Sequence, residues 1–451
     1  MPRILNCYTT QGNGSYQKDM AMKHRIFVFA GALLLVLVSG CHTSARHASQ
    51  LNAPPPQEIY IGQAFSAAPP VSPPPVYLVP STEEYAEIEE NTFKQVNNAP
   101  LSTFSIDVDT ASYANVRRIL NDSQLPIADA VRIEELINYF PYDYPQPAES
   151  DGPFSVTTEV GPCLWNPAHR LARIGLKGLE MDAEDRPRAN LVFLLDVSGS
   201  MQPDNKLPLV KRALRLLVPQ LHPEDRLGIV TYAGQAGIAL KSIRCTENNR
   251  KHILDVIEGL GAGGSTHGAA GLKTAYEMVN EEFRKNGINR VILCTDGDFN
   301  VGVTDEDELV EVITDNAKNG VFFTVLGFGM GNLKDDRLET LADKGNGAYG
   351  YIDSLTEARK VFLEEMTGTL VTIAKDVKIQ VEFNPARVAG YRLVGYENRM
   401  LTAEEFNDDT KDAGEIGAGH TVTALYEIVP AGQEIPGVNI DELRYQQTQP
   451  T

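Results

Sequence analysis

The stretch ANLVFLLDVSGS, residues 189–200, decides the fold. It begins with a nearly continuous apolar run, which is typical of a strand buried on both faces of a sheet. An Asp and small polar residues follow at once, at 196–200. In open α/β sheets, ligands bind beyond the carboxyl ends of the strands. Any chemistry of this chain is therefore expected where this strand ends.

Outward from this strand, apolar strands alternate with amphipathic helices as far as residue 373. The pattern predicts further strands at 226–233, 236–243, 289–296, 321–329 and 347–353, and helices at 206–221, 248–260, 268–286, 305–320, 333–345 and 354–373. This order predicts an α/β domain over 189–373, with a doubly wound, mostly parallel six-stranded sheet covered by helices on both faces. A very short turn joins the strands 226–233 and 236–243, so these two are expected to pair antiparallel at the sheet edge.

Short strand signals dominate the sequence on either side of this domain. Residues 82–188 are predicted to form an N-terminal β-rich flanking domain, which opens with a helix at 83–96. Residues 374–451 are predicted to form part of a C-terminal β-rich domain. The α/β domain is thus expected between two smaller β domains.

The first 41 residues are predicted to be upstream sequence plus a targeting signal. Basic residues precede an apolar stretch at 26–38, and Ser39-Gly40-Cys41 follows, which is typical of a signal peptide. The stretch is short for a membrane-spanning helix. The run at 38–41 resembles a bacterial lipobox, which would make Cys41 the lipid-bearing first residue of the mature protein. An ordinary secretory signal with a chance cysteine is the alternative, and residues 1–19 are expected to have no structure.

Residues 42–81 are rich in proline, which predicts an extended, semi-rigid linker. The formal net charge of the chain is −20, which argues against nucleic acid or anionic lipid as the main partner. The five cysteines show no C-x-x-C spacing, so neither a zinc ribbon nor a thioredoxin-type motif is indicated.

Three separate segments offer oxygen ligands at strand ends or in a Gly-rich loop. Asp196, Ser198 and Ser200 follow the first strand, Thr266 lies in the loop 263–268, and the strand 289–296 ends in the turn Asp296-Gly297-Asp298. Hydroxyls with few carboxylates suit a hard divalent cation. No Cys or His has the spacing of zinc ligands. The residues alone leave open which Asp of the turn takes part.

The run DVSGS at 196–200 resembles the D-x-S-x-S signature of von Willebrand factor A (VWA) domains. In that family the signature, a Thr from a later loop and an Asp after a later strand form a metal-ion-dependent adhesion site. The resemblance implies a divalent ion, Mg²⁺ in the first place with Mn²⁺ or Ca²⁺ as alternatives. The ligands it implies are Asp196, Ser198, Ser200, Thr266 and Asp296.

The flanking segments also resemble those of a bacterial subgroup of lipoproteins that carry this domain. FSIDVDTASYANVRR at 104–118 and VEFNPARVAGYRLVGYENR at 381–399 are among the similar segments. Members of that subgroup continue well past the point that corresponds to residue 451. The resemblance therefore implies that the last domain is incomplete here.

These features predict a non-enzymatic, metal-dependent module that binds the Asp or Glu of a protein partner. It is expected to be anchored by lipid in the bacterial cell envelope, at the outer membrane facing the periplasm. Nucleic acid and small-molecule cofactors are not expected. The alternatives are a metal-assisted hydrolase with His267 as general base, and a structural envelope protein whose metal braces loops. Lys206 is expected on the solvated face of the first helix of the α/β domain.

Overall fold

The computed structural model describes residues 3–8 and 83–437, apart from 107–108, 149–151, 183, 265–267, 298, 300–305, 331–332, 366–367, 369 and 409–412. The signal segment with Cys41 and the linker 42–81 lie outside the described residues. So do Thr266, His267 and Asp298. Within the described part of the chain, no helix is long and apolar enough to cross a membrane.

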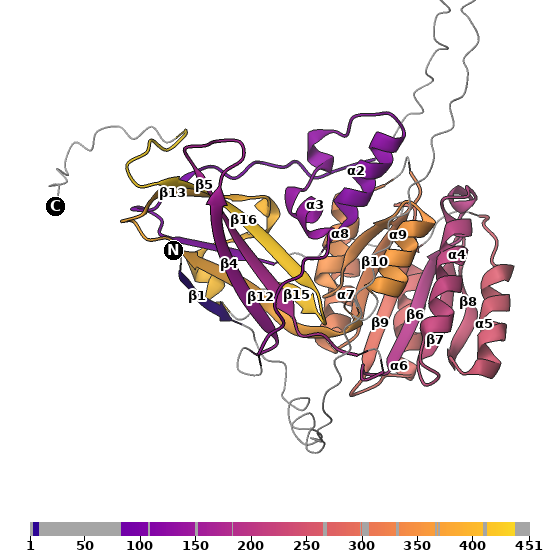
Figure 1. Ribbon diagram of the computed structural model, residues 1–451. Helices are drawn as coiled ribbons and strands as arrows, with labels where there is room; N and C mark the ends of the chain where they lie inside the picture. The colour runs from indigo at the N-terminus through magenta and orange to yellow at the C-terminus, as the bar shows by residue number, and fades with distance from the viewer. Residues whose placement is uncertain are drawn as a thin grey trace, which may run out of the picture. The chain divides into compact units, whose positions relative to one another are not determined.

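Six strands form the sheet of the α/β domain, in the order β11-β10-β9-β6-β7-β8 (Figure 1). The strands are β6 (Ala189–Asp196), β7 (Arg226–Tyr232), β8 (Ala236–Arg244), β9 (Ile288–Thr295), β10 (Phe322–Phe328) and β11 (Tyr349–Ile352). All neighbours pair parallel except β7 and β8, which pair antiparallel at the edge. The predicted mostly parallel sheet and its edge hairpin are both confirmed.

Helices cover both faces of this sheet. The helices on one face are α4 (Leu207–Leu217), α5 (Glu247–Gly259) and α9 (Leu355–Arg359), and those on the other are α6 (Gly268–Glu281), α7 (Glu306–Lys318) and α8 (Asp335–Lys344). Along β6, Leu191 and Phe193 pack into the first core, whereas Val192 and Leu194 pack into the second. Side chains of a strand alternate between faces, so burial on both sides explains the apolar run. The same burial holds β6 in place, and with it Asp196 at the last position of the strand.

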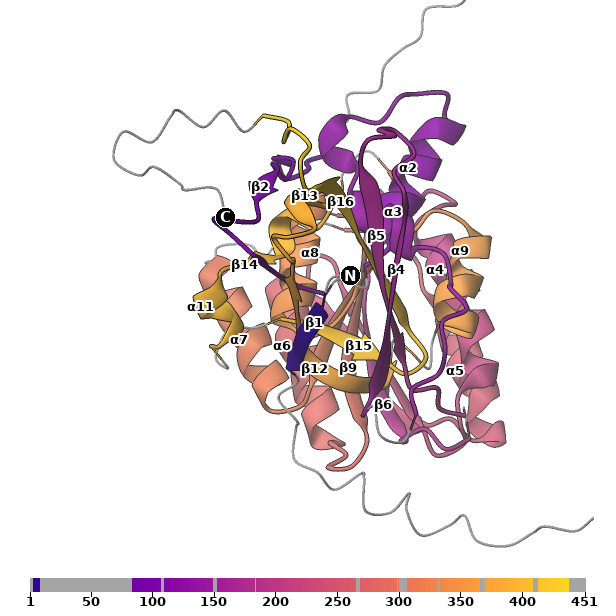
Figure 2. The ribbon, with the colours of Figure 1, turned by 60° about the vertical axis from the view of Figure 1, so that its left-hand side comes forward.

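Two further sheets lie outside the α/β domain. One contains β1 (Arg3–Tyr8), β3 (Leu101–Ser105), β12 (Thr372–Glu382), β14 (Met400–Leu401) and β15 (Gly414–Gly417). The other has the order β2 (Lys94–Gln95), β13 (Val388–Val394), β16 (Thr421–Pro430), β5 (Arg170–Gly178) and β4 (Phe154–Pro162) (Figure 2). The expectation that residues 1–19 have no structure is wrong for β1, which pairs with β12.

Strands from both sides of the α/β domain share these two sheets. In the first sheet Phe104 pairs with Ile379, and in the second Ile174 pairs with Ala424. These and other buried side chains form one common core, including Tyr426. The sequence predicts two separate flanking domains, but the structure interleaves their strands in one β unit. Strand patterns carry no information about distant partners, which is why the sequence does not indicate this.

Short helices complete the described chain. They are α2 (Ala111–Asn121), α3 (Ile133–Asn138), α11 (Ala403–Phe406), the 3-10 turns η1 (Ala128–Ala130), η2 (Gly199–Met201), η3 (Val218–Gln220) and η5 (Glu397–Arg399), and the π-helical turn η4 (Lys360–Glu364).

The helix predicted at 83–96 is wrong. This segment contains no helix: Glu84 forms an isolated parallel bridge with Lys334, and only Lys94–Gln95 form a strand, β2. The Glu84 amide donates to the carbonyl of Leu333 at 2.9 Å, and the Asp335 amide donates to the carbonyl of Glu84 at 3.1 Å. Backbone pairing with the α/β domain thus overrides the helix preference of the glutamates.

Candidate metal centre

Three of the predicted ligands meet at the carboxyl end of β6. Asp196 is the last residue of the strand and is fully buried. The Ser198 amide donates to Oδ1 of Asp196 at 2.8 Å, which bends the chain so that the next residues turn back over the strand end. The hydroxyls of Ser198 and Ser200 lie 2.9 Å apart. Ser198 is buried and Ser200 is exposed, so the hydroxyl pair runs from the interior to the surface.

The Gly-rich loop before α6 lies directly against this turn. The Gly199 amide donates to the carbonyl of Gly264 at 3.1 Å, and the Gly263 amide donates to the carbonyl of Val197 at 2.7 Å. Gly264 has a φ of +94°, which an L side chain rarely adopts. The loop is thus placed beside the serines as far as Gly264. Thr266, two positions further, lies outside the described residues.

Asp296 enters the same region from the neighbouring strand. It directly follows β9, which runs parallel to β6 with Leu195 opposite Cys294, and it is 1% exposed. Its Oδ2 accepts a hydrogen bond from the ammonium of Lys206 at 2.8 Å. The structure therefore brings Asp196, Ser198, Ser200 and Asp296 to one edge of the sheet, and this set is called the metal centre below.

Lys206 does not lie on a solvated helix face, so that expectation is wrong. The residue is 7% exposed and precedes Leu207, the first residue of α4. Pro208 follows within the first turn, where proline favours helix initiation. Helix initiation at this proline leaves Lys206 in the loop, free to turn inward. This proline is a sequence signal that the helix starts after Lys206, but it does not indicate that the lysine side chain turns inward.

The carboxylates of the metal centre are electrostatically strained. Burial raises the pKa of Asp196 to about 6, the Ser198 amide opposes that rise, and the negative charge of Asp296 adds to it. The Tyr232 hydroxyl at the end of β7 is also buried, which raises its pKa. Within the described residues, no hydrogen bond of ordinary geometry reaches Asp196 Oδ2, Asp296 Oδ1 or the Tyr232 hydroxyl, although the Tyr232 hydroxyl lies near enough to Asp196 to oppose the rise of its pKa.

These orphaned oxygens fit a divalent cation. Buried polar atoms normally have partners, and two buried carboxylates near each other repel unless a cation lies between them. Among the described residues, no group of three His, Cys, Asp or Glu side chains could hold a metal. A metal here would therefore depend on the hydroxyls of Ser198 and Ser200 as well as on the two carboxylates. That donor set suits Mg²⁺, Mn²⁺ or Ca²⁺ rather than zinc.

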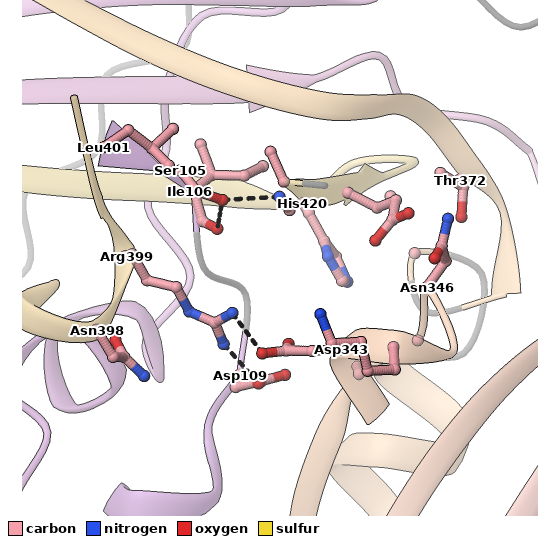
Figure 3. A pocket seen from close by; sticks show the side chains of 18 of the residues that line it. Ser105, Ile106, Asp109, Asp343, Asn346, Thr372, Asn398, Arg399, Leu401 and His420 are labelled. Atoms are coloured by element: carbon pink, nitrogen blue, oxygen red, sulfur yellow. Dashed lines mark hydrogen bonds and ion pairs between the residues drawn. The ribbon is translucent and has the colours of Figure 1, made fainter. Parts of the chain in front are cut away.

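Two cavities lie away from the metal centre, between the β unit and the α/β domain. One has a volume of about 230 Å³ and the other about 530 Å³, and His420 lines both. Figure 3 shows the smaller one, where the guanidinium of Arg399 pairs with Asp109 and Asp343. Burial, with the positive charges of Lys360 and Lys177, lowers the pKa of His420 to about 4. Sequence reasoning did not indicate these cavities.

Three family models match the chain. The model of the von Willebrand factor type A domain matches residues 190–366. A model described as von Willebrand factor matches 79–173, and one described as the C-terminal part of uncharacterized protein YfbK matches 368–451. The chain is therefore a protein built around a VWA domain, a class of domain that typically mediates protein interactions.

Among individual relatives, the chain is similar to Uncharacterized protein YfbK of Escherichia coli (strain K12). The two are 46% identical over 372 residues, which is 81% of this chain and 64% of the relative, so the chain spans less than two thirds of its length. Inter-alpha-trypsin inhibitor heavy chain H3 of Homo sapiens is 31% identical over 193 residues, covering 41% of this chain and 21% of that protein. A solved structure, von Willebrand factor type A from Catenulispora acidiphila, is 15% identical with a TM-score of 0.38, covering 62% of this chain and 75% of that one.

Proposed function

We propose that the VWA domain binds a divalent cation and uses it to capture a carboxylate of a protein partner. The proposed ligands are Asp196, Ser198, Ser200, Thr266 and Asp296, with Mg²⁺ as the first candidate ion. The observation that carries this proposal is the pair of buried carboxylate oxygens, Asp196 Oδ2 and Asp296 Oδ1, to which no hydrogen bond of ordinary geometry is made in the described residues. A cation would satisfy both at once.

A partner carboxylate suits the remaining coordination. Mg²⁺ takes six oxygen ligands, and the five proposed side chains leave at least one of these positions open. Only two of the five side chains are charged, because hydroxyls contribute no charge. Ser200 is exposed, so the ion would be reachable from solvent on that side. An incoming Asp or Glu would supply a charged oxygen there. The ion would act as a Lewis acid that binds this oxygen, and the protein itself would carry out no chemical step.

The proposal also covers the cellular location of the protein. The lipobox-like run before Cys41 supports a lipid anchor in the bacterial cell envelope, with the VWA domain held off the outer membrane by the linker 42–81 and facing the periplasm. Labelling with a lipid precursor, lost in Cys41→Ser, would test the anchor. Secretion of an unlabelled wild-type protein would contradict it.

The decisive experiment measures Mg²⁺ and Mn²⁺ binding by calorimetry. Asp196→Ala and the double variant Ser198→Ala with Ser200→Ala should lose binding while circular dichroism shows an intact fold. Asp204→Ala is the matched control, because Asp204 is an exposed carboxylate in the loop between Ser200 and α4. Unchanged affinity in the ligand variants would remove the proposal. Turnover of esters or phosphoesters that is lost in His267→Ala would instead favour the hydrolase.

A further inference from the structure

The side chain of Lys206 is fixed in its position by packing. Its alkyl chain lies against Gly329, which follows β10 with a φ of +80°, and a Cβ built there would meet Lys206 Cε at 2.3 Å. The carbonyl of Gly329 in turn accepts a hydrogen bond from the Tyr351 hydroxyl. The absence of a side chain at 329 therefore makes room for the lysine. Lys206 is therefore a buried neighbour of the metal centre, held in place by packing, and not a surface lysine.

The charge of Lys206 changes the balance at the metal centre. Counted as formal charges, Asp196 and Asp296 contribute −2 and Lys206, 2.8 Å from Asp296, contributes +1, so the ion-free group sums to −1. A divalent cation changes that sum to +1. Without the lysine, the occupied site would be neutral. Burial strengthens each of these interactions, because water screens them poorly.

We propose that Lys206 acts as an internal cation that competes with the divalent ion for Asp296 and leaves the occupied centre one positive charge in excess. This inference rests on the proposed function and names its regulation. The excess charge weakens the metal when it binds alone. A carboxylate that arrives with the metal neutralises this charge, so metal and carboxylate bind cooperatively. The lysine thereby makes the site favour the metal-plus-partner state over the metal-only state.

The coupling is reciprocal. If an acidic partner tightens metal binding by some factor, the metal must tighten partner binding by the same factor. Couplings between linked sites typically amount to about 5- to 150-fold. Lys206 is the group to which this structure assigns the coupling, because it adds a positive charge within hydrogen-bond distance of a proposed ligand. Replacing it with an uncharged side chain of similar shape should remove the coupling and keep the metal site.

The test is a titration cycle with Mg²⁺ and acetate as the actual probes. Calorimetry gives the Mg²⁺ dissociation constant with and without saturating acetate, corrected for the Mg²⁺–acetate complex measured in blank titrations. In the wild type, acetate should tighten Mg²⁺ binding at least about fivefold. In Lys206→Met, Mg²⁺ alone should bind about tenfold more tightly and acetate should have little further effect. Lys206→Arg keeps the charge and should keep the acetate effect.

Lys251→Met is the matched control, because Lys251 is exposed on α5 and its loss removes the same charge from the same domain. Lys206→Gln replaces the Met variant if circular dichroism shows that the latter does not fold. Wild-type Mg²⁺ binding without any acetate effect, or a Lys206→Met affinity no tighter than wild type, would overturn the role of Lys206. Absence of Mg²⁺ binding in both wild type and Lys206→Met would instead overturn the metal site itself.

Discussion

The guanidinium of Arg132 donates from Nη1 to Oδ2 of Asp335 at 2.6 Å, which joins the residue before α3 to the first residue of α8 in the VWA domain. Both side chains are almost fully buried, at 6% and 1% exposure. Glu339, one turn further along α8, pairs with the same guanidinium. A buried charge cluster therefore joins this segment to the VWA domain, in addition to the apolar contact that Ala111 and Ala114 of α2 make with the same domain.

Loss of Arg132 should destabilise the protein strongly. Arg132→Met leaves Asp335 and Glu339 buried without this counter-charge, and breaking a buried pair from one side costs roughly 3–5 kcal/mol. Urea unfolding at neutral pH should show that loss. Arg215→Met is the control, because its pair with Glu258 is 60% and 64% exposed and should contribute less than about 1 kcal/mol. Equal losses in the two variants would contradict the importance of burial.

Stability should fall in acid partly because of His420. Its pKa is lowered to about 4 in the folded protein from an ordinary value of 6.5. Below pH 6.5 His420 therefore binds a proton in the unfolded chain but stays neutral in the folded protein until about pH 4. The free energy of unfolding thus decreases as the pH falls from 6.5 to 4. His420→Gln should show a shallower loss of unfolding free energy between pH 6.5 and 4. His252→Gln, at an exposed position on α5, is the comparison, and an unchanged slope in His420→Gln would refute the assignment.

A methyl group at Gly347 should not be tolerated. An ideal Cβ there would lie 1.9 Å from the carbonyl oxygen of Phe323 in β10, so the backbone would have to shift. Gly347→Ala should lower the melting temperature, with a cost of about 1–3 kcal/mol typical of overpacking. Gly161→Ala, where a Cβ meets nothing within 4 Å, should change stability by less than about 0.5 kcal/mol. A Gly347→Ala protein as stable as wild type would show that this strand end can move.

Metal should stabilise the fold if the proposed site is correct. An ion present at one hundred times its dissociation constant adds about 2.7 kcal/mol to the free energy of unfolding, because it binds the native state. The Asp196→Ala variant should show no such Mg²⁺ effect. Thermal melts with Mg²⁺ and with EDTA provide the comparison. Equal Mg²⁺-dependent shifts in wild type and Asp196→Ala would place the ion elsewhere.

The sequence predicts the VWA sheet well because its strands are buried on both faces. Val192 and Phe193 point to opposite cores, and such strands appear as continuous apolar runs that few other structures produce. Asp196, Ser198 and Ser200 also lie together, as expected for polar residues two apart at one strand end, whereas their role as metal ligands stays a prediction. Features that depend on the local pattern of residues, such as these strands and the turn after β6, can therefore be predicted from the sequence.

The remaining features depend on partners that are distant in the chain. Nothing near Phe104 indicates that its strand pairs with that of Ile379, and nothing near Glu84 indicates that its backbone pairs beside Leu333. The sequence predicts Lys206 on the solvated face of the first helix because lysines on an amphipathic helix are usually exposed. Its inward position follows from the space beside Gly329, which belongs to another loop.

The interleaved β unit also sets an order of events during synthesis. Strands β3, β4 and β5 leave the ribosome before the VWA domain, but their partners β12 and β16 are translated after it. The VWA domain has all six of its sheet strands in one stretch, from β6 to β11, so its sheet needs no strand that is translated earlier or later. The nascent β4–β5 hairpin lacks its neighbour β16 until then, and a chain released before residue 372 would carry a complete VWA sheet beside a β3 without its partner β12 and a β5 without its partner β16.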